Sequence, residues 1–156
     1  MKALASVIVV VLLACTVFAQ RKSAGFDPTR DAAKDIAAAA AKAAKEHKRV
    51  LVDVGGEWCP WCHKLEEFFE ANKDARDLRD KSFVTVKVNY SAENKNEGVL
   101  SKYPKIPGYP HLFVLDSAGK LVHSQDTGLL ESGDHHDHDK VVAFLKKWAA
   151  APADAK

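Results

Sequence analysis

The stretch VLVDVGGEWCPWCHKLEE, residues 50–67, carries two cysteines between two different sequence patterns. Before them, the mostly β-branched run 49–54 ends at two glycines, which predicts a short buried strand. After them, Leu65, Phe68 and Phe69 fall on one face of a helix that we expect to continue to about residue 80. The cysteines are therefore expected in a turn that joins a buried strand to a helix.

The two cysteines fit three kinds of site. Cys59-Pro60-Trp61-Cys62 is a C-x-x-C sequence, which is typical of a redox-active dithiol. With His63 it becomes C-x-x-C-H, the attachment sequence of a c-type haem. It is also half of a zinc site, although zinc would need a second ligand pair at metal spacing. We favour the dithiol because the motif lies between a strand and a long helix, with loop residues between the cysteines.

The spacing of the cysteines argues against a purely structural disulfide. The chain has three cysteines, and Cys15 lies in the apolar N-terminal run. A disulfide between Cys59 and Cys62 would close a loop with two intervening residues, and the stabilisation from loop closure grows with loop length. The pair is therefore expected to serve chemistry.

The first residues predict export. Residues 3–19 form a nearly unbroken apolar run behind Lys2, and Val17-Phe18-Ala19 offers the small residues that signal peptidase reads. We expect residues 1–19 to be a signal peptide cleaved before Gln20, and residues 20–27 to be a linker. The product would be periplasmic or secreted.

A lipid anchor is the alternative. Residues 12–15, Leu-Leu-Ala-Cys, resemble a bacterial lipobox, which would make Cys15 the lipidated first residue. The apolar run continues past Cys15, whereas lipoproteins usually turn polar there. We therefore favour the soluble product.

The rest of the chain predicts one α/β domain over residues 28–151, followed by a frayed tail at 152–156. Strands separated by helices indicate parallel pairing, and a closing hairpin adds an antiparallel part. The pattern thus predicts a mixed central sheet flanked by helices on both faces. The expected elements after the linker, besides those around the cysteines, are an alanine-rich helix at 28–48, a strand at 82–90, a short helix at 94–101, a proline-rich loop at 103–110, strands at 111–116 and 120–125 joined by 117–119, and a helix at 138–151 capped by Asp139.

Charge gives no sign of a nucleic-acid partner. The 23 Lys and Arg residues nearly balance the 21 Asp and Glu residues, and no basic block is interleaved with aromatic residues. We therefore expect no nucleic acid to bind, and we expect the domain to act as a monomer.

Four features in register resemble the thioredoxin superfamily. Asp53 matches the buried acid six residues before the first cysteine, and Trp58 matches the tryptophan just before that cysteine. Lys87 in TVKVN matches the lysine of the next strand, and Pro110 in GYPHLFVLD matches a cis-proline. The resemblance spans residues 30–150 and is closest to exported bacterial thioredoxin-7-like proteins, similar also to the periplasmic domain of thiol:disulfide interchange reductases.

The resemblance implies a thioredoxin fold and a thiol–disulfide oxidoreductase. Cys59, at the start of a helix whose N–H groups and dipole favour negative charge, would be the nucleophile. Cys62, expected to be more buried, would resolve the mixed disulfide. The inner pair Pro60-Trp61 differs from the Gly-Pro of general thioredoxins and is similar to glutaredoxins and periplasmic oxidants. The direction of electron flow therefore stays open.

The resemblance also assigns the surrounding residues. Asp53 would be a buried proton acceptor with a raised pKa, which Lys87 would moderate. His63 would tune the dithiol or face solvent. No organic cofactor is implied, and the expected partners are protein disulfides or dithiols and a membrane or periplasmic electron donor. The expected substrate-binding residues are Trp58, Pro60, Trp61, Tyr109 and Pro110.

A histidine-rich segment, residues 131–140, supports a different class of function. His135, His136 and His138 are weak candidate metal ligands, and with them the domain would be a binding module for a metal or a partner protein. We favour a solvated loop in which Asp137 or Asp139 caps the next helix, because three nearby side chains rarely make a closed site.

Overall fold

The computed structural model describes residues 25–150. The expected signal peptide at 1–19, Cys15, most of the expected linker at 20–27 and the expected tail at 152–156 lie outside the described residues. Among residues 25–150, no helix is both long and apolar enough to cross a membrane.

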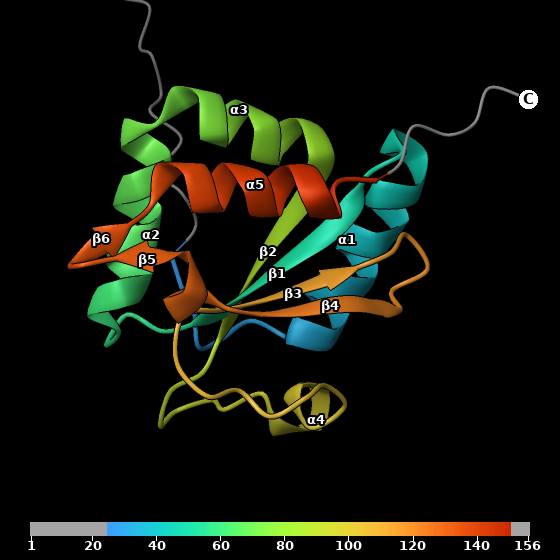
Figure 1. Cartoon of the computed structure of the whole chain (residues 1–156). Coiled ribbons are helices and arrows are strands. Elements are labelled where there is room, and N and C mark those ends of the chain that lie inside the picture. Colours follow the sequence, from blue (N-terminus) through green and yellow to red (C-terminus); the bar gives the residue numbers. More distant parts are fainter. Residues whose placement is uncertain (1–24, 151–156) are drawn as a thin grey trace, which may run out of the picture.

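A four-stranded sheet forms the centre of the domain (Figure 1). Its strands lie in the order β2 (Phe83–Asn89), β1 (Arg49–Gly55), β3 (His111–Leu115) and β4 (Leu121–Asp126). The β1–β2 pair is parallel, whereas β3 is antiparallel to both β1 and β4. This is the expected mixed sheet, and β1 occupies an inner position because nearly all of its residues are buried apolar ones.

One face of the sheet is covered by α1 (Ala32–Glu46). The Asp31 carboxylate accepts hydrogen bonds from two backbone N–H groups of the first turn, so the helix starts there and not at Pro28 as we expected. Small apolar side chains let the helix pack closely on the valines of β1. Its buried residues are Ala32, Ile36, Ala39 and Ala43.

The other face is covered by α2 (Pro60–Ala71), α3 (Lys73–Ser82) and α5 (His138–Trp148), as Figure 1 shows. Leu65, Phe68 and Phe69 of α2 are buried in this layer, as their helical spacing predicted. The carboxyl end of β1 leads directly into α2, so the turn with the two cysteines lies at this edge of the sheet.

The helix expected over residues 63–80 is in fact two helices. Asn72 interrupts it with a non-helical backbone, at φ −107° and ψ 88°. The Asn72 side-chain amide donates to the Phe68 carbonyl at 2.8 Å, beside its own backbone N–H at 2.9 Å. The asparagine side chain thereby competes with the helical hydrogen-bond ladder and turns α3 away from α2.

The connections before β4 follow the expected order, whereas the segment after β4 contains structure that we did not expect. The short helix α4 (Glu97–Leu100) lies in the long segment between β2 and β3. The β3–β4 turn depends on Gly119, which has a φ of +81°. After β4 come a 3-10 turn, Thr127–Leu130, and a small hairpin of β5 (Glu131–Ser132) and β6 (His135–His136).

The structure selects one of the two expected caps of α5. The Asp137 carboxylate accepts from the Lys140 N–H at 3.0 Å, so Asp137 is the cap and Asp139 lies in the first turn. The helix ends at Trp148, before the expected end at 151.

The cap gives a matched pair of substitutions. Asp137→Ala should lower the free energy of unfolding by about 1 kcal/mol, because the Lys140 N–H loses its partner. Asp139→Ala, which removes an exposed carboxylate from the same turn, should change it by less than about 0.5 kcal/mol. Urea melts of both variants measure the difference, and equal losses would contradict the cap assignment.

Candidate active site

The two cysteines lie where β1 ends and α2 begins. Cys59 is the N-cap of α2 and Pro60 its first residue, so a residue without an N–H occupies a position where none is needed. Cys59 and Cys62 form a disulfide. The Cys59 Sγ atom also accepts a hydrogen bond from the Cys62 N–H at 3.1 Å. The helix N-terminus thus points its N–H groups at the first cysteine, which favours a negative charge there.

Burial does not distinguish the two cysteines. Each is 2% exposed, whereas we expected Cys62 to be the more buried. Phe26 forms one buried cluster with the two cysteines, and Trp61 and Tyr109 pack against this cluster. In the disulfide form, therefore, the helix cap and not exposure distinguishes Cys59.

A glycine lets α2 approach the sheet. A Cβ atom on Gly55 would lie 2.4 Å from the Cys62 Sγ atom, so no larger residue fits without displacing the disulfide. Gly55 lies two residues after Asp53, and alternate residues of a strand face the same side. The Cys62 sulfur and the Asp53 side chain therefore lie on the same face of β1.

Asp53 is a buried acid on this face. It is 7% exposed, and none of the described residues donates a hydrogen bond to its Oδ1 atom. Burial raises the pKa of Asp53 to about 7, while the positive charges of Lys87 and Arg79 act in the opposite direction. The raised pKa and the moderating Lys87 were both expected from the sequence.

Lys87 is paired with Asp53 across the two parallel strands. Its ammonium forms an ion pair with Glu66 of α2, and both side chains are largely buried. The Glu66 carboxylate in turn raises the pKa of Asp53. Sequence reasoning missed Glu66, although its position one helical turn after Cys62 would have placed it on the same face of α2.

Aromatic residues form one wall of the site. The Trp58 indole is half exposed and donates to the Tyr90 carbonyl at 2.6 Å. The Tyr109 ring packs edge-on against Trp58 and stacks on Tyr90. Beside them lies a groove of about 770 Å³, whose lining includes Phe26, Glu57, Trp58 and Tyr90.

The Tyr109–Pro110 peptide is cis, as expected, and Tyr109 packs against the cluster around the disulfide. The Pro110 side chain is fully buried, and its carbonyl accepts from the Thr127 hydroxyl at 2.5 Å. Thr127 had no distinguishing pattern in the sequence. Pro60 is exposed and Trp61 partly so, which leaves these two at the open side of the site.

His63 lies in the first turn of α2, as expected. Its Nε2 atom donates to the Glu57 carbonyl at 2.8 Å, and the ring is about half exposed. The imidazole thus connects the helix to the turn before Cys59.

The histidine-rich segment is not the simple solvated loop that we expected. His136 is 3% exposed, and its ring packs edge-on against Trp61. Burial lowers the pKa of His136. His135 faces solvent beside Asp134, whereas His138 bonds to Asp74 of α3. Within residues 25–150, no three His, Cys, Asp or Glu side chains are arranged to hold a metal ion.

The fold and the dithiol together define a protein of the thioredoxin class. The chain belongs to the thioredoxin-like family, whose model matches residues 31–117. Protein disulfide-isomerase of Datisca glomerata is 26% identical over 108 residues, an alignment that covers 69% of this chain and 20% of the isomerase. Disulfide bond reductase DsbH of Chlamydia pneumoniae is 26% identical over 85 residues, covering 49% of this chain and 51% of the reductase. The chain thus spans about a fifth of the isomerase and about half of the reductase.

Solved structures agree on the fold. A disulphide isomerase from Xylella fastidiosa Temecula1 superposes with a TM-score of 0.67 and 25% identity, covering 78% of this chain and 94% of that one. The oxidised C-terminal domain of DsbD from Neisseria meningitidis superposes with a TM-score of 0.58 and 20% identity, covering 80% of this chain and 99% of that one. The central sheet and its helices are therefore those of the thioredoxin fold.

The pKa of Asp53 makes stability depend on pH. The native acid keeps its proton up to about pH 7, whereas the unfolded acid ionises near 3.8, so this contribution is lost as pH rises through that window. Asp53→Asn cannot titrate. Between about pH 5 and about pH 8, its free energy of unfolding should therefore rise relative to the parent by on the order of 2 kcal/mol.

Urea melts at the two pH values measure this change. Asp77→Asn, at an exposed aspartate of α3, is the control and should follow the parent at both. If the free energies of unfolding of the parent and of Asp53→Asn differ by the same amount at both pH values, the pKa of Asp53 is an ordinary one.

Proposed function

We propose that the protein is a thiol–disulfide oxidoreductase that acts on protein disulfides. The observation that carries this proposal is the Cys59–Cys62 disulfide at the N-terminus of α2, in contact with the strand that holds the buried Asp53. A structural disulfide of this spacing would add little stability and would need no buried acid beside it. The names of the related isomerase and reductase support the same class of reaction.

The reaction starts from the reduced dithiol. The Cys59 thiolate attacks one sulfur of a substrate disulfide, and the other substrate sulfur leaves as a thiolate. Cys62 then gives its proton to the ionised Asp53 and attacks the Cys59 sulfur. This forms the Cys59–Cys62 disulfide and releases the second substrate sulfur, so the substrate gains two electrons that the dithiol loses. Run in reverse, the same steps oxidise a substrate dithiol.

The aromatic residues around the dithiol are the proposed substrate surface. Trp58, Pro60 and Trp61 are at least partly exposed around the buried disulfide, and Tyr109 lies next to Trp58. Pro110 is buried, so it contributes by shaping the loop and not by touching a substrate with its side chain. An extended peptide next to the substrate cysteine would lie along these aromatic residues.

The c-type haem alternative would use both sulfurs as thioethers and His63 as an axial ligand. Here the sulfurs are bonded to each other, and the His63 Nε2 atom is bonded to the Glu57 carbonyl. These two contacts favour dithiol chemistry. The binding-module alternative loses support because His135, His136 and His138 contact three different partners.

The roles of the cysteines are tested by trapping. Cys59→Ser should lower the rate of insulin-disulfide reduction by at least about a hundredfold, because the attacking thiolate at the helix N-terminus is lost. Cys62→Ser should instead accumulate mixed disulfides with substrate, because attack continues without resolution. Non-reducing gels of both variants measure the difference, with His135→Ala as the control that should reduce insulin at the parent rate.

Three results would contradict the proposal. Trapping by Cys59→Ser alone would reverse the two roles. A parent protein that reduces no insulin would favour the binding module. A Soret band on protein made with cytochrome-maturation machinery would favour the haem alternative.

We further propose that the protein is exported and receives electrons from a membrane or periplasmic donor. The proposal rests on the apolar run 3–19 and the small residues before Gln20. Expression of the full chain in a bacterial host should yield, in the periplasmic or culture fraction, a protein whose intact mass corresponds to a start at Gln20. A diacylglyceryl mass on Cys15 would support the lipoprotein instead, and uncleaved protein in the cytoplasm would contradict export.

A further inference from the structure

The segment before α1 contains one buried side chain. We call residues 25–31 the 25–31 segment. Phe26 is only 4% exposed, whereas the other residues of this segment are exposed. We expected part of this segment to be a linker, but its aromatic residue belongs to the buried cluster that contains the two cysteines. Nothing in the reaction described above uses Phe26.

The Phe26 ring lies over the space that Gly55 leaves open. A Cβ atom on Gly55 would lie 2.9 Å from Phe26 Cζ as well as 2.4 Å from the Cys62 sulfur. The Lys87 ammonium lies 4.9 Å from the centre of the same ring. The ring therefore extends from Cys62 toward Lys87, on the face of β1 that carries Asp53.

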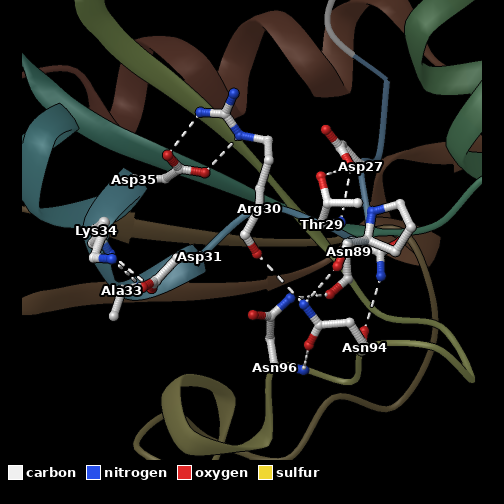
Figure 2. Close-up of polar contacts among 11 residues, drawn as sticks. Asp27, Thr29, Arg30, Asp31, Ala33, Lys34, Asp35, Asn89, Asn94 and Asn96 are labelled. Atoms are coloured by element: carbon white, nitrogen blue, oxygen red, sulfur yellow. Dashed lines mark hydrogen bonds and ion pairs between the residues drawn. The ribbon is translucent and has the colours of Figure 1, made fainter.

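Hydrogen bonds hold the 25–31 segment in this position. The Phe26 N–H donates to the Glu57 carboxylate at 2.7 Å. The Asn94 amide donates to the Pro28 carbonyl at 2.9 Å and lies 3.4 Å from the Arg30 carbonyl. Figure 2 shows how the side chains of Asn89, Asn94 and Asn96 meet beside this segment.

The asparagines are themselves connected to the end of β2. The Asn89 amide donates to the Asn94 carbonyl at 2.8 Å, and the Asn96 amide donates to the Asn89 carbonyl at 2.7 Å (Figure 2). Because β2 is paired with β1 along its whole length, this network fixes the 25–31 segment relative to the strand of Asp53.

The 25–31 segment also separates two hollows. Phe26 and Pro28 line the groove of about 770 Å³ beside Trp58. Gly25 and Arg30 line a second hollow of about 320 Å³, where Lys87 and Glu66 also lie. Phe26 thus lies between the groove and the charged residues around Asp53.

We propose that Phe26 is a positioning residue that keeps water away from the Cys62 sulfur and the Asp53 carboxyl. An apolar ring at this place removes the solvent that would otherwise stabilise the charged carboxylate. The charged groups that face Asp53 are Lys87 of β2, Glu66 of α2 and Arg79 of α3, and Phe26 leaves all three in place. The consequence for proton transfer from Cys62 rests on the proposed function, but the exclusion of water does not.

The first test is the accessibility of Cys62. The chain has three cysteines, and Cys15 lies in the expected signal peptide. In the reduced Cys59→Ser protein without residues 1–19, Cys62 is therefore the one thiol that iodoacetamide can alkylate. Adding Phe26→Ala should speed its alkylation by iodoacetamide at least about fivefold, because the covering ring is lost. Phe144→Ala, which removes an equally buried ring from α5, is the matched control and should leave alkylation unchanged.

The second test is the pH dependence of stability, measured without any activity assay. In the parent, ionisation of Asp53 should lower the urea midpoint between about pH 5 and about pH 8. In Phe26→Ala this drop should be smaller by about half or more, because water would reach the carboxylate. Phe144→Ala should lower the midpoint at both pH values and keep the drop. Phe26→Leu, which keeps an apolar cover, should behave much like the parent.

If Phe26→Ala does not fold, Glu57→Ala replaces it in the first test. It removes the acceptor of the Phe26 N–H without deleting a buried apolar group, and should also speed alkylation of Cys62. Glu67→Ala, at an exposed glutamate of α2, is its control. A Phe26 or Glu57 variant in which Cys62 stays protected and the pH-dependent drop persists would show that Phe26 only stabilises the fold.

These outcomes are independent of the proposed function. A parent protein that reduces no disulfide would contradict the oxidoreductase, while the alkylation and urea results would still decide the role of Phe26.

Discussion

The close approach of α2 to the end of β1 determines most of the site. A Cβ atom on Gly55 would lie 2.4 Å from the Cys62 sulfur, so the disulfide can sit against the strand only because this position has no side chain. Asp53 lies two residues earlier on the same face, and the same approach places Glu66 of α2 beside Lys87, the β2 residue paired with Asp53. The position of the dithiol and the ion pair beside Asp53 therefore depend on one packing contact.

Burial and charge act in opposite directions on the acid. Removal of solvent disfavours the charged carboxylate and raises its pKa, whereas the positive charges of Lys87 and Arg79 stabilise the carboxylate and lower its pKa. The result is a pKa of about 7, where a carboxyl group can both accept and release a proton near neutral pH. An acid with a lower pKa would be a weaker base, and one with a higher pKa would seldom be ionised.

Much of this arrangement could be predicted from the sequence. A β-branched run indicated the strand at 49–54, and the spacing of apolar residues indicated the helix after the C-x-x-C motif. The positions of Asp53, Trp58, Lys87 and Pro110 relative to the cysteines resemble one superfamily. The mixed sheet followed from the order of elements. The break at Asn72 was missed because asparagine occurs both inside and between helices, and its side-chain bond to Phe68 depends on the local turn.

Long-range contacts account for the other differences. Phe26 is the only large apolar residue between 20 and 35, so no periodicity indicates that it is buried. Its partners Cys62 and Glu57 lie more than 30 residues away. His136 looked like one of three equivalent histidines, yet only the β5–β6 hairpin places it against Trp61. Such contacts follow from the tertiary fold and have no local sequence pattern.

The most direct test of the account is the titration of the Asp53 carboxyl carbon by NMR in the oxidised protein. The signal can be assigned by its loss in Asp53→Asn. We expect its midpoint at about pH 7. A midpoint near the ordinary value of 3.8 would show that the carboxyl is hydrated and ionised, and would contradict the proposal that Asp53 accepts the proton of Cys62.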